Sequence, residues 1–302
     1  MFPLKACYWG QKGARDNYSL QIENIIDAGH KVLGDMPILV GECGIPMDMK
    51  YVPFGCFLLT KLIVISDKEA LRTENWIWQY RMMDAMMTAL ERSLASFTYV
   101  PYVLWDRYAD LYYFRLWTYN PDNTDTHGDH WNGENFSWFS RRRALPPSLL
   151  DLDQSSFTLD NGGRILQSVV RPYPAKTAGI PSRFDYEMNT GEFTFEWTLT
   201  EECTSRETEI YIPSLVYHGR KLVVGGLAAE DKYAYDESRQ TLFVVHSDSS
   251  PSKTRRIHVS VQPPLRGHFH VNTFLGDFGE LILSGLVVFI GVFMFVKFGF
   301  YM

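Results

Sequence analysis

Hydrophobic residues recur at helical spacing in two segments of the first third of the chain. The first segment covers residues 16–33 and the second residues 75–94. Their apolar positions are Tyr18, Ile22, Ile25, Ile26 and Leu33 in the first, and Trp76, Tyr80, Met83, Met87, Leu90 and Leu94 in the second. Apolar side chains three or four positions apart share one side of an α-helix, so both segments are predicted to be amphipathic helices.

A short apolar run, Ile38 to Val40, follows the first helix after the helix-stopping residues 34–37. The run is predicted to be a buried strand, and it ends in Gly41 and a single carboxylate, Glu42. A polar residue at the carboxyl end of a strand that follows a helix is typical of an α/β barrel or doubly wound sheet, where active-site groups gather. Glu42 is therefore either a functional carboxylate or a residue that caps a loop.

Residues 116–140 begin as a strand and continue as a long loop rich in Trp, Asn, Asp and His. Indole rings beside amides and carboxylates suit a sugar, whose apolar face stacks on an aromatic ring and whose hydroxyls need hydrogen-bond partners. The candidate substrate-binding residues are Trp117, Asn120, Asp129, His130, Trp131, Asn132 and Glu134. The cluster of His127, Asp129 and His130 matches no strong metal motif, so we expect a hydrogen-bonded loop and no metal site.

The pattern changes to short alternating runs in the second half of the chain. Such runs occupy residues 191–199, 208–217, 240–247 and 255–261, with turn residues between them. Alternation at this spacing predicts an all-β sandwich, which we place at residues 157–268. Residues 141–156, with Pro146 and Pro147, are the expected linker, and residues 1–140 are the expected α/β region.

The last segment is an uncharged apolar run, residues 281–296, followed by Lys297. Helix from residue 281 to residue 302 would measure about 33 Å at ~1.5 Å per residue, enough to cross a bilayer. We expect a membrane-anchor helix at residues 278–302, with an interfacial or core helix as the alternative.

Composition and charge narrow the class of protein. The chain has 302 residues, 46% hydrophobic and 21% charged, which indicates a globular protein with room for two domains. A net charge of −6 without a broad basic block makes nucleic acid an unexpected partner. The four scattered cysteines form no disulfide framework, which favours a reducing compartment. No secretory signal is visible, so we expect an intracellular, membrane-associated protein with no cofactor.

Three segments together resemble the family-five glycoside hydrolases, in the fungal, endoglycoceramidase-related branch that acts on glucosylceramides and steryl glucosides. They are RDNYSLQIENIIDAGH…PILVGECGIPMD, LWTYNPDN…GDHWNGENFSWFS and GGRILQSVVRPYPAKTAGIP. The resemblance implies the C-terminal part of a (β/α)8 TIM barrel followed by an antiparallel β-sandwich. It implies that Glu42 is the nucleophile at the end of the seventh barrel strand, and that Trp117 on the eighth strand is the platform beneath the scissile sugar.

The resemblance also shows what this sequence lacks. Retaining hydrolysis needs a second carboxyl group as acid/base. The family carries it in an Asn-Glu pair, and this sequence contains no such dipeptide. Before Glu42 there is room for one helix only. We therefore expect a truncated, inactive form of a retaining β-glucosidase of glycolipids.

The alternative is a non-enzymatic, membrane-tethered β-sandwich that binds carbohydrate or a partner. The sequence upstream in the gene would separate the two hypotheses. Sterol or ceramide as aglycone stays open, as does the oligomeric state.

Two stretches interrupt the resemblance, at residues 51–66 and 99–115. Both begin with Tyr-Val, whose codons can encode an intron donor, and both end in a residue that can supply the closing AG in the same phase. Their removal would leave GIPMDMNDKEAL and SFTLWTYNPDN, which run on as the family does. They are either translated, unspliced introns or true loop insertions, and transcript sequence would decide.

Overall fold

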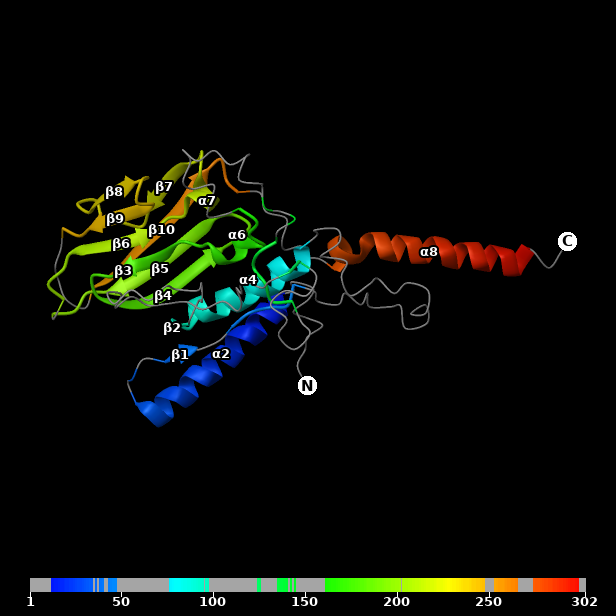
Figure 1. Ribbon diagram of the computed structural model, residues 1–302, viewed down its shortest axis with the longest axis horizontal. Coiled ribbons are helices and arrows are strands. Elements are labelled where there is room, and N and C mark those ends of the chain that lie inside the picture. The colour runs from blue at the N-terminus through cyan, green and yellow to red at the C-terminus, as the bar shows by residue number, and fades with distance from the viewer. Residues whose placement is uncertain are drawn as a thin grey trace.

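Two packed antiparallel sheets dominate the computed structural model of the protein (Figure 1). The structure describes residues 12–34, 36, 38–40, 43–47, 76–94, 96–97, 124–125, 135–140, 142, 144, 161–201, 203–247, 253–265 and 274–298. Both interrupting stretches, residues 51–66 and 99–115, lie outside the described residues.

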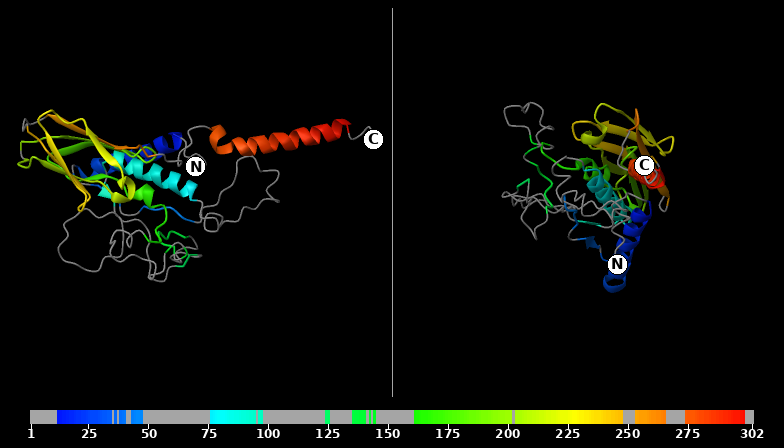
Figure 2. Two further views of the ribbon diagram at one scale, coloured as in Figure 1. Left: turned by 90° about the horizontal axis from the view of Figure 1, so that it is seen from above. Right: turned by 90° about the vertical axis from the view of Figure 1, so that its right-hand side faces the viewer.

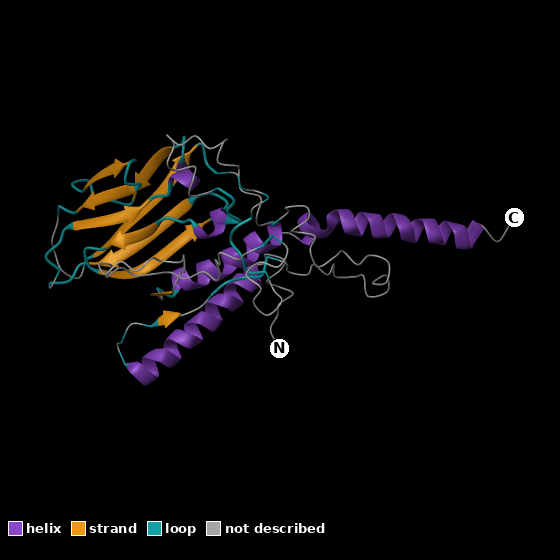
Figure 3. Ribbon diagram, viewed as in Figure 1, coloured by secondary structure: helices purple, strands orange, loops and turns teal. Residues whose placement is uncertain are grey.

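The sandwich consists of two four-stranded sheets with the strand orders β4-β5-β10-β7 and β3-β6-β9-β8 (Figure 3). Its strands are β3 (Tyr173–Lys176), β4 (Ile180–Glu187), β5 (Glu192–Thr198), β6 (Glu207–Tyr211), β7 (Lys221–Gly225), β8 (Lys232–Asp236), β9 (Thr241–Val245) and β10 (Thr254–Gln262). Two one-turn helices, α6 (Leu166–Val169) and α7 (Ser214–Tyr217), accompany them. The predicted antiparallel, sheet-rich C-terminal region is confirmed.

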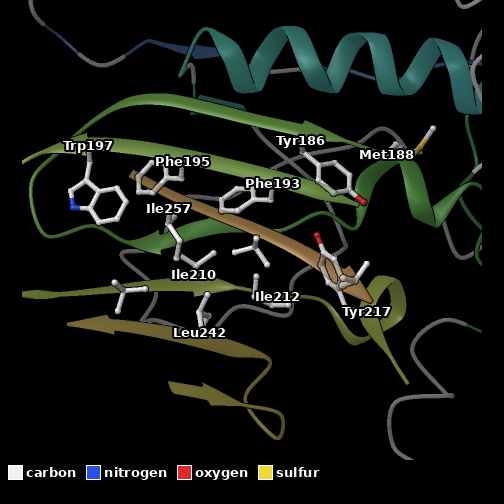
Figure 4. Packing of buried hydrophobic residues seen from close by; sticks show 13 residues of the cluster. Tyr186, Met188, Phe193, Phe195, Trp197, Ile210, Ile212, Tyr217, Leu242 and Ile257 are labelled. Carbon is white, nitrogen blue, oxygen red and sulfur yellow. The ribbon is translucent and has the colours of Figure 1, made fainter. Parts of the chain in front are cut away.

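Alternation along the strands builds the core between the two sheets (Figure 4). On β5, Phe193, Phe195 and Trp197 are fully buried. Phe195 and Trp197 stack with their ring centroids 4.8 Å apart. Ile210 on β6 and Leu242 on β9 are also fully buried and belong to the same cluster. Successive side chains of a strand point to opposite faces, so each sheet presents one apolar face to the other.

The strands β5, β9 and β10 lie where the alternating runs predicted them. The predicted strand at residues 208–217 is wrong in its second half, where β6 ends at Tyr211 and α7 begins at Ser214. Proline has no amide hydrogen for the sheet ladder, and Pro213 stands directly before α7. No alternating run predicts strand β4. Its first four residues are all exposed, so they show no alternation of apolar and polar side chains.

The N-terminal part has α/β character. Helices α2 (Lys12–Leu33) and α4 (Ile77–Arg92) pack against each other, and strands β1 (Leu39–Val40) and β2 (Ser96–Phe97) pair in parallel. Both predicted helices are confirmed. The predicted extent of the second helix is wrong at Leu94, because α4 ends at Arg92. Leu94 has a φ of +52° and is 41% exposed.

The last helix, α8 (Phe274–Phe298), extends away from the rest of the molecule (Figures 1 and 2). Apolar side chains along it are exposed, among them Val287, Phe289 and Val292. In the part of the chain that the structure describes, no helix is long and apolar enough to cross a membrane. The membrane-spanning anchor expected at residues 278–302 is therefore not supported.

Candidate functional site

The predicted catalytic and sugar-binding residues lie outside the described residues. They are Glu42, Trp117, Asn120, Asp129, His130, Trp131, Asn132 and Glu134. The structure does describe nearby segments of the chain, at residues 38–40, 43–47, 124–125 and 135–140. The contacts of these segments are described below.

The segment that follows Glu42 is fixed by packing and by hydrogen bonds. Ile45 and Met47 are fully buried in one cluster with residues of α4. The side-chain amide of Gln79 on α4 donates to the Met47 carbonyl over 3.0 Å. The Met47 amide in turn donates to the carbonyl of Asn135. The chain on the carboxyl side of Glu42 is thus held between α4 and the end of the candidate sugar-binding loop.

Cys43, directly after Glu42, is half-buried, and its burial raises the pKa of the thiol to about 11. A thiol with such a pKa stays protonated at neutral pH and is a poor nucleophile. Cys43 is therefore not a rival to Glu42 for covalent chemistry.

Arg164 ties together two described parts of the candidate sugar-binding loop, residues 124–125 and 135–140. Its guanidinium is 1% exposed and donates to Asp125 Oδ1 over 3.2 Å. It also donates to Asn135 Oδ1 over 3.2 Å and to the Ser137 carbonyl over 3.0 Å. The same group lies over the ring of Trp76 at 5.3 Å. Sequence reasoning missed Arg164, because a lone charge in the stretch GGRIL does not show its distant partners.

Gly162 allows residues 139–140 of this loop to approach the segment before α6 closely. Gly162 has a φ of +80°, and a Cβ there would lie 2.6 Å from the Phe139 ring and 2.8 Å from the Ser140 carbonyl oxygen. The Ser140 amide donates to the Gly162 carbonyl over 2.8 Å. A residue with a side chain at position 162 would therefore push the end of the loop away.

A buried charge network joins the α/β part to the sandwich. Arg171, 2% exposed, donates to Asp84 on α4 and, over 3.0 Å, to Glu91 on the same helix. Asp84 also accepts from Arg15 on α2 over 2.8 Å, and Arg15 pairs with Glu187 on β4 over 3.3 Å. Charges removed from water are retained in a fold when they are paired in this way.

The network contains two guanidinium groups and three carboxyl groups, so the carboxyl groups do not all lose their protons equally readily. Burial raises the pKa of Glu91 to about 7, while the charge of Arg171 lowers it and that of Asp84 raises it again. A carboxyl group with this pKa suits a general acid, but the side chain of Glu91 is 3% exposed and lies between α4 and Arg171. A proton donor must reach the substrate, so Glu91 is not a candidate for the missing acid/base.

We expect the free energy of unfolding to fall as the pH rises from about 4.5 to about 7. The pKa of Glu91 is higher in the folded than in the unfolded chain, so the folded chain holds a proton that the unfolded chain has released in this window. At 1.36 kcal/mol per pKa unit the loss attributable to Glu91 is at most roughly 3 kcal/mol. Denaturant unfolding at both ends of the window measures it, with Glu91→Gln as the matched variant. Equal pH dependence in the two proteins would contradict the assignment.

Within the described segments, no group of three His, Cys, Asp or Glu side chains is placed to hold a metal ion. The cluster of His127, Asp129 and His130 lies outside those segments, so the expectation about it stays a prediction.

The fold and the sequence together identify a domain class. Residues 171–261 match the glycoside hydrolase family 5 C-terminal domain, and this range contains the strands from β3 to β10 except for Gln262, the last residue of β10. The chain therefore carries this family's C-terminal domain, and the predicted resemblance is confirmed.

Two curated fungal proteins are similar over most of this chain. A glucosylceramidase of Cryptococcus neoformans var. grubii is 36% identical over 256 residues, which are 83% of this chain and 30% of the relative. A glucosylceramidase of Rhizopus delemar is 33% identical over 253 residues, which are 82% of this chain and 32% of the relative. The chain thus spans about a third of the length of these relatives.

A crystal structure of Cryptococcus neoformans sterylglucosidase 1 has a similar fold. The match has a TM-score of 0.64 at 24% identity and covers 84% of this chain and 33% of the crystallised one. At this identity the likeness supports the fold and nothing finer.

Proposed function

We propose that this chain contributes the nucleophile of a retaining β-glucosidase that acts on glycolipids, either glucosylceramide or a steryl glucoside. The observation that carries the proposal is the 36% identity to a glucosylceramidase over 83% of the chain. The C-terminal domain of glycoside hydrolase family 5 at residues 171–261 agrees with it. In this proposal residues 1–140 are the last part of a TIM barrel, and Glu42 stands at the carboxyl end of its seventh strand.

In the proposed reaction the Glu42 carboxylate attacks the anomeric carbon of glucose. The bond from that carbon to the aglycone oxygen breaks, and the oxygen takes a proton from an acid. Water then attacks the glucosyl ester, and the product retains the β configuration. Trp117 supports the apolar face of the sugar, and the hydroxyls bond to residues of the loop. These are Asn120, Asp129, His130, Asn132 and Glu134, beside the second indole, Trp131.

The acid/base glutamate of the family's Asn-Glu pair has no counterpart in this sequence. Two carboxyl groups about 5–5.5 Å apart are needed for the retaining mechanism. We therefore expect the purified chain to leave a fluorogenic β-glucoside intact.

A chimera tests the proposal directly. This chain is joined to the part of the Cryptococcus neoformans glucosylceramidase that it does not cover, once with and once without residues 51–66 and 99–115. We expect at least one form to hydrolyse glucosylceramide. If the two stretches are introns, the form that lacks both of them should be the more active one. Two folded but inactive chimeras would contradict the proposal, as would hydrolysis by the chain alone.

We also propose that α8 lies on the surface of a membrane as an interfacial helix and does not cross it, which would place the chain beside a glycolipid substrate. The support is the row of exposed apolar side chains along α8, together with Lys297, whose long stem can reach the headgroups.

Sedimentation with phospholipid vesicles at neutral pH measures this attachment. The full chain should sediment with the vesicles, and a variant that ends at His270 should stay in the supernatant. A control with an unrelated exposed change, Glu23→Gln on α2, should behave as the full chain does. Equal sedimentation of the full and shortened chains would show that α8 does not attach the chain to membranes.

A further inference from the structure

A cleft of about 280 Å³ opens between the two sheets of the sandwich, at the edge where β7 and β8 lie. Strand β7 is the last strand of one sheet and β8 the last strand of the other. Helix α7 contributes residues to the same cleft, and Figure 1 shows all three elements near one another in the sandwich. The cleft is formed entirely by the C-terminal domain and contains no residue of the α/β part.

The floor of the cleft is apolar and its wall is aromatic. Leu222 and Val224 line it from β7, two positions apart and so on one face of the strand. Tyr233 and Tyr235 line it from β8 in the same relation. The Tyr233 side chain is 54% exposed, and a large exposed aromatic ring at a concave site is available for stacking.

The rim of the cleft carries both donors and acceptors. Arg220, His218 and Glu237 are among the residues that line it. Arg220 is held in place because its Nη1 donates to the Pro263 carbonyl over 2.7 Å. Among the described residues, no hydrogen bond engages the side chains of His218, Tyr233 or Glu237. These side chains are therefore available to a ligand.

We propose that this cleft binds a neutral sugar ring, stacked on Tyr233, with its hydroxyls bonded to Glu237 and His218. A sugar ring has an apolar face, which can lie on the apolar floor, and hydroxyl groups around its edge, which can bond to the polar rim. The rim carries one cation, Arg220, and one anion, Glu237, so its charges do not favour a ligand of either sign. The volume is just below the ~300–1,000 Å³ of small-molecule pockets, which fits one or two sugar rings and not a folded peptide.

The proposal goes beyond the glucosidase reaction, since it gives the sandwich a sugar site of its own that does not include Glu42. A segment of peptide paired with the β7 or β8 edge is the competing occupant. Such a peptide would bond to backbone groups of the edge strand, so its affinity would not depend on the side chains of Tyr233 and Glu237.

The test is saturation-transfer NMR on the full chain in detergent, with methyl β-D-glucopyranoside and cellobiose as the probes. We expect binding, weakened about tenfold in Tyr233→Ala and in Glu237→Gln, which corresponds to ~1.4 kcal/mol each. The matched control is Tyr173→Ala, which removes a 37% exposed tyrosine from β3 at the opposite edge of the same sheet. Both lining residues are on the surface, and thermal unfolding checks that each variant folds.

Trp117→Ala, which removes the proposed platform for the sugar in the active site, separates this site from the active site. Sugar binding that is unchanged in Trp117→Ala and weakened about tenfold in Tyr233→Ala supports the sandwich site even if the chimera proves inactive. Absence of binding would overturn the inference, and so would binding that Tyr233→Ala and Glu237→Gln leave unaltered, or binding that only Trp117→Ala removes.

Discussion

Replacement of Arg171 by alanine should lower the free energy of unfolding by about 3–5 kcal/mol, the usual effect of breaking a buried ion pair. Arg171 is 2% exposed and pairs with Asp84 and Glu91 of α4. Its guanidinium also lies 5.2 Å from the centre of the Tyr186 ring, in the core of the sandwich. Without it the two carboxyl groups stay buried and lose a shared cation. Because the network joins α4 to the sandwich, α4 should detach before the sandwich unfolds.

Chemical denaturation with hydrogen exchange measures both effects. Lys176→Ala is the control, since Lys176 pairs with Glu209 over 3.1 Å at the surface, where ion pairs contribute little. If Arg171→Ala were as stable as Lys176→Ala, or if α4 and the sandwich still opened together, the network would not be what joins the two parts.

The second large effect is on the rate of hydrolysis. In an active chimera, Glu42→Gln should lower kcat by about 10⁴-fold or more, because loss of a covalent nucleophile removes the first chemical step. An amide has nearly the shape of the carboxylate, so substrate binding should change little. Glu23→Gln, at an exposed position of α2, is the matched control and should keep the full rate. A chimera whose rate survives Glu42→Gln would assign the nucleophile elsewhere.

Periodicity predicted the helices α2 and α4 and the strands β5, β6, β9 and β10, but it did not reveal β3, β4, β7 or β8. Alternation identified β5, β9 and β10 because one face of each of these strands is buried between the sheets. Helical spacing identified α4, whose Met83 and Leu90 are fully buried. The same reasoning failed at Leu94, where the chain had already left the helix, because spacing does not show where a helix ends.

The residues that hold the candidate site in place could not be predicted in the same way. Arg164 and Arg171 are charged, and charged residues are ordinarily expected at the surface. Their burial depends on partners more than 25 positions away, Asn135 for the first and Glu91 for the second. No local pattern contains that information. The cleft between β7 and β8 escaped prediction for a related reason, since it depends on which strands become the edges of the two sheets.

The central claim, that Glu42 is the nucleophile, is tested most directly by trapping the glucosyl ester. A 2-deoxy-2-fluoro-β-glucosyl fluoride carries a leaving group that departs without an acid, and its fluorine at C2 slows the hydrolysis of the ester. Incubation with an active chimera, digestion and mass spectrometry should find one added 2-fluoroglucosyl group, on the peptide that contains Glu42, and none in the Glu42→Gln variant. A label on any other carboxylate, or an unlabelled Glu42 in a chimera that hydrolyses glucosylceramide, would contradict the account.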